Sequence, residues 1–220
     1  MRNSFTEEEL KRVREAVALA ERQTAGEIVP FVIARSDRYD IAEWRGASLA
    51  AVLAMGLVGL THLFYDGWGL AWMYSGQGVA FIALVAGAAG ALAGAYIKPL
   101  KRLLAGAGLL DRTVHHRAMR AFVEEEVFKT VDRTGILLFV SMLEHRIEVI
   151  GDEGINRKVT VDDWAGVVAE IRKGILDGRL ADGMVRAITM CGGLLGRKGV
   201  DIQPDDTNEL PDDIRFSDEG

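Results

Sequence analysis

Four acidic residues between positions 152 and 163 are the side chains best suited to metal chemistry. Asp152 and Glu153 follow a predicted strand, and Asp162 and Asp163 open a predicted helix. Carboxylate oxygens in such loops are ligands that calcium and magnesium prefer, so these four residues are candidates for a calcium or magnesium site. Their spacing matches no calcium-loop motif, however, and acidic residues before a helix often cap its N-terminus instead.

A second group places two histidines among arginines. His115 and His116 lie beside Arg112, Arg117 and Arg120. Guanidinium groups pair well with phosphate oxygens, so this segment is a candidate phosphate site. A basic helix face against anionic membrane headgroups would have the same composition. We favour the lipid interpretation because the segment closely follows a long apolar stretch.

A third group flanks two predicted strands. Thr130, Asp132 and Arg133 precede one strand, and Glu144 and His145 precede the next. These residues either line a cleft or are ordinary turn and edge residues. The chain contains no G-x-S-x-G, P-loop, H-E-x-x-H or C-x-x-C motif, so no motif supports nucleophilic, nucleotide or zinc chemistry. No catalytic residue and no cofactor-binding residue is assigned from the sequence.

The chain is nearly free of charge from residue 46 to residue 97. Asp66 is the only Asp, Glu, Lys or Arg in these 52 residues. One passage through the hydrocarbon core of a membrane takes about 20 apolar residues. The stretch therefore predicts a hairpin of two transmembrane helices, at about 47–65 and 79–97, joined by a glycine-containing turn. The Gly90-x-x-x-Gly94 spacing predicts close helix packing, either within this hairpin or between two copies of the chain.

Positive charges flank this hairpin but are absent from its turn. Arg35, Arg38 and Arg45 precede it, and further Lys and Arg residues follow it. Because cytoplasmic flanks retain Lys and Arg, we predict a membrane protein with both termini in the cytoplasm. The segment from residue 100 to residue 110 is predicted to lie along the membrane surface. The residues expected to contact lipid headgroups are Lys98, Lys101, Arg102 and Arg112.

The net charge of -6 is concentrated at the C-terminus. Residues 201–220 hold eight of the 32 acidic residues and one of the 26 basic residues, which leaves 24 acidic and 25 basic residues elsewhere. A body this close to neutral argues against a nucleic-acid partner, which would require a basic surface. The acidic, proline-containing segment 200–220 is predicted to be a disordered tail.

Outside the hairpin the sequence alternates between helical and strand patterns. Thr6 and Glu9 form a capping box at the start of an amphipathic helix. Pro30 lacks a backbone donor, which suggests an edge position or an irregularity in the first strand. The periodicity predicts helices at 7–22, 113–129, 162–176 and 180–195, and strands at 27–35, 134–141 and 146–150.

This order of elements predicts an α/β or α+β sandwich with helices on both faces of the sheet. Of the two we expect the α/β class, with a small mixed sheet. The hairpin is then an insertion after the first strand. The predicted divisions are 1–44 and 99–199 for the α/β domain, 45–98 for the hairpin and 200–220 for the tail.

Three segments carry a family resemblance: Thr130-x-x-Arg133-Thr134-Gly135 with the apolar strand after it, the stretch from Glu144 to Ile155, and the first strand from Thr24 to Val32. They resemble the TPM domain family, which is named after thylakoid, phosphatase and membrane proteins. The similarity covers most of residues 1–196 and looks closest to a short bacterial branch with two transmembrane helices. This resemblance implies a TPM-like sandwich of helices around a small sheet.

The resemblance also implies a range of functions. Some members of the family are described as acid phosphatases, some bind calcium, and several act in the repair or assembly of membrane complexes. Bacterial members often accompany LemA-type membrane proteins. We therefore expect a non-enzymatic interaction, assembly or quality-control module on the cytoplasmic face of a bacterial inner membrane, with membrane lipid and a LemA-type protein as partners. The alternative is an acid phosphatase assisted by a divalent metal.

Overall fold

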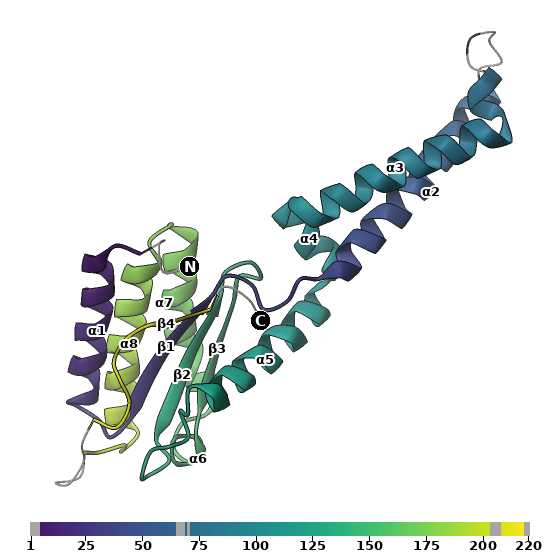
Figure 1. Ribbon diagram of the computed structural model, residues 1–220. Coiled ribbons are helices and arrows are strands. Elements are labelled where there is room, and N and C mark those ends of the chain that lie inside the picture. Colours follow the sequence, from purple (N-terminus) through teal and green to yellow (C-terminus); the bar gives the residue numbers. More distant parts are fainter. Residues whose placement is uncertain (1–4, 65–68, 70, 203–207, 218–220) are drawn as a thin grey trace. The chain divides into compact units, whose positions relative to one another are not determined.

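The computed structural model describes residues 5–64, 69, 71–202 and 208–217. The chain divides into two compact units (Figure 1). The first unit combines Met1–Asp37 with Asp111–Gly220, and the second is the inserted stretch Arg38–Leu110. The second unit follows the first strand in the chain, and its bounds are wider than the 45–98 predicted for the hairpin.

The first unit contains most of the helices and all of the strands that the structure describes. α1 begins at the predicted capping box, where the Glu9 amide donates to the Thr6 hydroxyl at 3.2 Å and the Thr6 amide donates to the Glu9 carboxylate at 2.8 Å. The elements are α1 (Glu7–Glu21), β1 (Glu27–Ile33), α5 (Ala107–Glu124, which starts in the second unit), β2 (Gly135–Ser141), β3 (Arg146–Gly151), α6 (Glu153–Asn156), the 3₁₀ turn η3 (Val161–Trp164), α7 (Ala165–Leu176), α8 (Leu180–Arg197) and β4 (Arg215–Ser217).

The four strands form one mixed sheet in the order β3-β2-β1-β4. β1 runs parallel to both β2 and β4, whereas β2 and β3 form an antiparallel pair. All seven residues of β2 are buried, and β3 is half-exposed, as the apolar run and the alternating pattern predict. The predicted α/β class with a small mixed sheet is confirmed.

Helices cover both faces of this sheet (Figure 1). Alternate strand residues point to opposite faces, so Ile28 and Val32 pack with α1, α7 and α8. Val29 and Phe31 pack instead with Val114 and its neighbours on α5. Two apolar cores result, one on each side of the sheet, and they hold β1 and β2 rigidly in the centre.

The C-terminal segment differs from the prediction. The prediction of a disordered tail is wrong for residues 208–217, because β4 pairs with β1 from Phe31 to Ile33. Leu210 and Ile214 are buried, one in each core. Two apolar side chains with this spacing supply enough burial to hold a segment that is otherwise acidic.

Pro30 does not lie in an edge strand, since β1 has a neighbour on each side. Its position nevertheless obeys the physical rule behind the prediction. The Ala34 amide donates to Ser217, so the even-numbered residues of β1 direct their backbone groups toward β4. β4 pairs only from Phe31 onward, so the Pro30 nitrogen, which has no hydrogen to donate, faces the stretch of the edge before this pairing.

The helix predicted at 113–129 is shifted toward the N-terminus. α5 occupies Ala107–Glu124 and ends before Glu126, which has a positive φ of 56°. A separate helix, α4 (Lys98–Ala105), precedes it, and Gly106 with φ 84° divides the two. Residues 100–110 therefore belong to two helices, which Gly106 separates. That this segment lies along the membrane surface stays a prediction.

The second unit is a helical hairpin with a short helix at its base. Its elements are α2 (Asp40–Phe64), the 3₁₀ turn η2 (Ala71–Tyr74), α3 (Gly76–Tyr96) and α4. α2 and α3 are long and apolar enough to cross a membrane. The end of the first predicted span, Tyr65, and part of the predicted turn lie outside the described residues.

Small residues bring α2 and α3 into close contact. A Cβ on Gly90 would lie 2.3 Å from the carbonyl oxygen of Gly46, and one on Gly94 would lie 2.7 Å from that of Ala42. Backbones approach this closely only where side chains are absent. Of the two alternatives for the Gly90-x-x-x-Gly94 spacing, the structure therefore has the packing within the hairpin.

Two basic residues tie α4 to α2. The Arg45 guanidinium donates to the carbonyl oxygens of Leu104 and Ala105 at 2.7 and 2.9 Å. The Lys101 ammonium donates to the Arg38 carbonyl at 2.9 Å and is 3.8 Å from the Glu43 carboxylate. These contacts extend the second unit to Leu110. The prediction that Lys101 contacts lipid headgroups is wrong, because this side chain is buried against α2.

Candidate functional site

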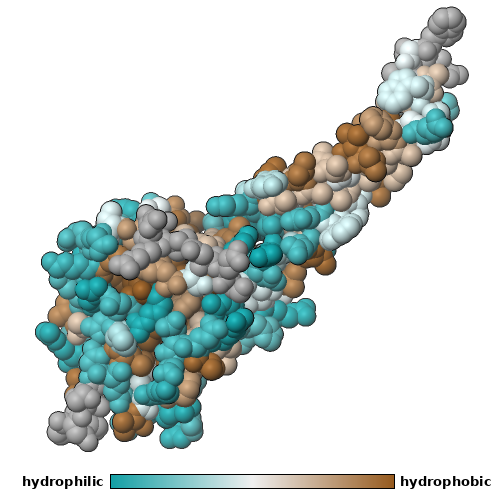
Figure 2. Space-filling view, viewed as in Figure 1, coloured by the Kyte–Doolittle hydropathy of each residue, from teal (hydrophilic) through white to brown (hydrophobic). Residues whose placement is uncertain are grey.

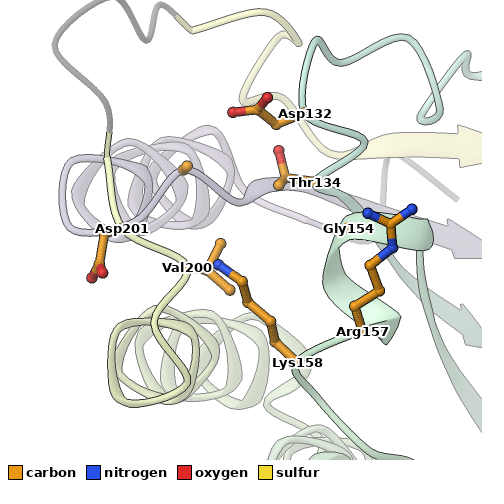
Figure 3. Close-up of a pocket in the computed structure, with 8 residues that line it drawn as sticks. Asp132, Thr134, Gly154, Arg157, Lys158, Val200 and Asp201 are labelled. Carbon is orange, nitrogen blue, oxygen red and sulfur yellow. The ribbon is translucent and has the colours of Figure 1, made fainter.

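A cleft of about 230 Å³ opens at the N-terminal ends of β1 and β2 (Figure 3). Two of the three residue groups singled out in the sequence meet around it, because the loop before β2 and the loop after β3 adjoin. The lining residues are Ala25, Asp132, Thr134, Gly154, Arg157, Lys158, Val200 and Asp201.

Asp152, two residues before the lining residue Gly154, is paired with Arg133. Two nitrogens of the Arg133 guanidinium lie close to the Asp152 carboxylate: Nη2 is 3.0 Å from Oδ1, and Nε is 2.8 Å from Oδ2. Asp152 is only 6% exposed and also caps α6 through the Glu153 amide at 2.7 Å. A guanidinium therefore occupies the place that a cation would take beside this carboxylate.

Gly154 fixes the distance between the two loops. A Cβ at this position would lie 2.4 Å from the Asp132 carbonyl oxygen and 2.8 Å from that of Arg133. The Gly154 amide donates to the Arg133 carbonyl at 2.9 Å. The close approach of these backbones therefore requires a glycine at position 154, after β3.

Charges of both signs surround the cleft. The Arg157 guanidinium pairs with Glu153, and the Lys158 ammonium donates to the Gly199 carbonyl. Asp201 lies across the opening from Arg157, and Asp132 lies between them at the top of the view (Figure 3). This arrangement suits a small polar ligand that donates or accepts several hydrogen bonds.

The four predicted metal ligands are not brought together. Asp163 accepts from the Thr160 amide at 2.8 Å and from the Lys198 ammonium at 2.6 Å. Lys198 and Thr160 lower the pKa of Asp163 to about 2. Among the described residues, no group of three or more His, Cys, Asp or Glu side chains could hold a metal ion. Two of the four residues cap helices instead, as the alternative proposed: Asp152 caps α6, and Asp163 belongs to the capping box of η3.

The histidine and arginine group lies on α5, where most of its members pair with carboxylates. Arg117 and Arg120 both contact Glu124, at 3.2 and 2.8 Å. His115 Nδ1 lies 3.5 Å from Glu148 of β3. These pairs connect α5 to itself and to the sheet, so they leave less positive charge for phosphate or lipid than the sequence suggests.

Glu144 lies at the opposite end of β2 from the cleft. It is 1% exposed, and its carboxylate accepts from the Ser36 amide at 2.8 Å and from the Ser141 hydroxyl. The Ser36 and Ser141 hydroxyls are also within 2.8 Å of each other. This buried network joins the ends of β1 and β2. The length of β2 separates Glu144 from Thr130, Asp132 and Arg133 of its predicted group.

The sequence analysis missed a group of carboxylates near the start of β1. Glu27 is 7% exposed and accepts from the amides of Glu209 and Leu210, each at 3.3 Å. Glu21 accepts from the Ile28 amide at 2.8 Å. Burial raises the pKa of Glu27 and raises that of Glu21 to about 8. An acidic residue that opens an otherwise apolar strand was the available signal.

The hairpin presents a second candidate surface. Only 6% of the most apolar part of α2 and 11% of that of α3 are buried. Hydrophobic side chains gather along this unit (Figure 2), and those of Leu53, Leu63 and Leu84 are more than half exposed. Contiguous apolar surface on this scale exceeds what single soluble domains expose, which indicates a membrane or protein contact.

No protein-family model and no curated protein sequence matches the chain. Among solved structures, the chain is similar to the NMR structure of the BA42 protein from the psychrophilic bacterium Bizionia argentinensis. The TM-score is 0.57 at 19% sequence identity, over 97% of this chain and 95% of that chain. This likeness concerns the fold alone.

Proposed function

We propose that the protein is anchored in the inner membrane of a bacterium by the α2–α3 hairpin, with both termini in the cytoplasm. The observation that carries this proposal is the lipid-like exposure of two helices that are long enough to span a bilayer. Their polar contacts are confined to the ends of the helices, as the hydrocarbon core requires.

Residues at the base of the hairpin support this orientation. Trp44 is 75% exposed and Tyr96 is 80% exposed, and such rings prefer the headgroup level. Lys98 and Arg112 are exposed nearby in sequence, and Arg102 is partly exposed. We assign headgroup contact to Lys98, Arg102 and Arg112, and we omit Lys101 because Arg38 and Glu43 engage it.

The first unit is proposed to be a TPM-like interaction or assembly module that engages another membrane protein. Its carboxylates support a structural role, since Asp152 pairs with Arg133 and Asp163 pairs with Lys198. The family resemblance makes a LemA-type membrane protein the expected partner. Among the side chains available for partner contact, Leu19, Val123 and Leu176 are apolar and more than half exposed.

The rival function is a metal-assisted phosphatase. The observation in its favour is the cleft beside Arg157 and Lys158, whose cations suit a phosphate group. The guanidinium beside Asp152 weighs against it, because a divalent metal would have to displace Arg133.

Two measurements on the detergent-solubilised and membrane-bound protein separate these functions. A photo-crosslinking residue at Leu19, Val123 or Leu176 should capture one recurrent membrane protein in native membranes. A generic phosphomonoester should not be turned over with or without Mg²⁺ or Ca²⁺. Crosslinks to lipid alone, or turnover that Asp152→Asn abolishes without loss of folded protein, would favour the phosphatase or another function.

A further inference from the structure

The C-terminal clamp, residues 208–217, closes the edge of β1 that faces away from β2. Its strand contributes three paired positions only, Arg215 to Ser217. Ion pairs add to these at Arg14–Asp213 and Arg215–Glu125, and the Phe216 ring lies 5.3 Å from that of Phe5. A parallel pairing this short depends on the contacts at its N-terminal side to stay in register.

Those contacts are made by carboxylates. Glu27 accepts from the amides of Glu209 and Leu210, and the Glu209 carboxylate accepts from the Val131 amide at 3.1 Å. Glu21 satisfies the Ile28 amide, which faces the stretch of the β1 edge that β4 does not reach. Glu27 thus attaches the clamp to β1, and Glu209 attaches it to the loop before β2. Both of these acceptors, and Glu21 beside them, carry negative charge when ionised.

The charges around Glu21 are unbalanced. Its Oε2 is shielded from solvent and has no hydrogen-bond partner among the described residues. The groups that act on Glu21 are Glu27 from β1 and Asp212 from the clamp, and those that act on Glu27 are Glu209 and Asp212. The two arginines that form ion pairs at the clamp do not pair with Glu21 or Glu27: Arg14 pairs with Asp213, and Arg215 pairs with Glu125.

A proton resolves this imbalance. On Oε2 of Glu21 it would turn an unsatisfied acceptor into a donor toward the neighbouring Asp212 carboxylate. We propose that residues 208–217 form a releasable clamp on β1, closed while Glu21 holds a proton and opened as Glu21 ionises. Opening would free the edge of β1 at Ala34, whose amide now donates to Ser217, for another extended segment.

The direction of the pH dependence follows from the two states of Glu21. In the closed clamp its pKa is about 8, and in the open clamp it returns toward 4.5. The closed state therefore binds more protons between these values, so closure is strongest below pH 4.5 and weakens up to about pH 8. Glu27, whose pKa is also raised, adds to the effect in the same direction.

Hydrogen exchange of the full-length protein in detergent micelles, corrected for intrinsic exchange at each pH, tests the clamp. Protection of residues 209–217 should fall about tenfold or more between pH 6 and pH 8, while β2 stays protected. Glu21→Gln keeps an acceptor for the Ile28 amide and should flatten this dependence. Glu15→Gln, on an exposed turn of the same helix, should leave it unchanged.

Three results would overturn the clamp. One is constant protection of residues 209–217 from pH 6 to pH 8 in the unmodified protein. Another is an unchanged slope in Glu21→Gln. The third is an equal loss of protection in β2, which would mean global unfolding. None of these depends on whether the hairpin crosses a membrane or on the identity of any partner.

Discussion

Replacing Gly90 by leucine is expected to separate α2 from α3 and to destabilise the hairpin by about 3 kcal/mol. Even the first carbon of a side chain would lie 2.3 Å from the Gly46 carbonyl oxygen and 2.6 Å from the Ala50 Cβ. The obstacle is mainly backbone, so no rotamer relieves it, and the helices must move apart. Contacts along the whole hairpin then weaken together.

A disulfide trap in native membranes measures this separation. A Cβ on Gly87 would lie 3.7 Å from the Ala51 Cβ, close to the mean for disulfides. The double variant Ala51→Cys with Gly87→Cys should therefore crosslink on mild oxidation, and adding Gly90→Leu should reduce the yield severalfold. The matched control is Gly59→Leu on α2, where a Cβ would meet no atom within 4 Å. Equal losses in both variants would refute the close-packing account.

Asp152→Ala is expected to lower the free energy of unfolding by about 2–3 kcal/mol. The substitution removes the cap of α6 and leaves Arg133 without its buried partner. Because the Arg133 side chain is half-exposed, water compensates part of the loss. Asp162→Ala, in contrast, should change stability by less than about 0.5 kcal/mol, since Asp162 is exposed.

Denaturant unfolding of the two variants, with and without Ca²⁺ or Mg²⁺, distinguishes a structural pair from a metal site. The structural account predicts a large loss for Asp152→Ala, a small one for Asp162→Ala and no effect of either ion. A metal site built from both residues would instead give stabilisation of the unmodified protein by the ion. Loss of that stabilisation in both variants would contradict the structural account.

The features that the sequence predicts well are those encoded by neighbouring residues. The capping box at Thr6 and Glu9 defines the start of α1 because both partners lie within one turn. The two long apolar helices follow from local composition in the same way. The alternation in β3 and the unbroken apolar run in β2 distinguish a half-exposed strand from a central one.

The features that it fails to predict depend on partners distant in the chain. The residues around β4 are acidic and include proline, which does not predict a strand. β4 forms because it pairs with β1 and because Leu210 and Ile214 beside it are buried in the two cores. From its neighbours in the sequence Lys101 is expected to contact lipid headgroups, but its ammonium donates to the Arg38 carbonyl, 63 residues away. Asp152 likewise resembles a metal ligand, whereas Arg133 on another loop supplies its counter-charge.

The central claim is the double crossing of the membrane with both termini in the cytoplasm. Two variants that each carry one introduced cysteine test it. The native Cys191 can stay in both, because it is fully buried and should not react. In intact spheroplasts treated with a membrane-impermeant maleimide, Gly69→Cys between α2 and α3 should be labelled. Asp201→Cys, beyond α8, should be labelled only after lysis. Labelling of Asp201→Cys in intact spheroplasts, or recovery of the protein in a high-speed supernatant, would contradict the account.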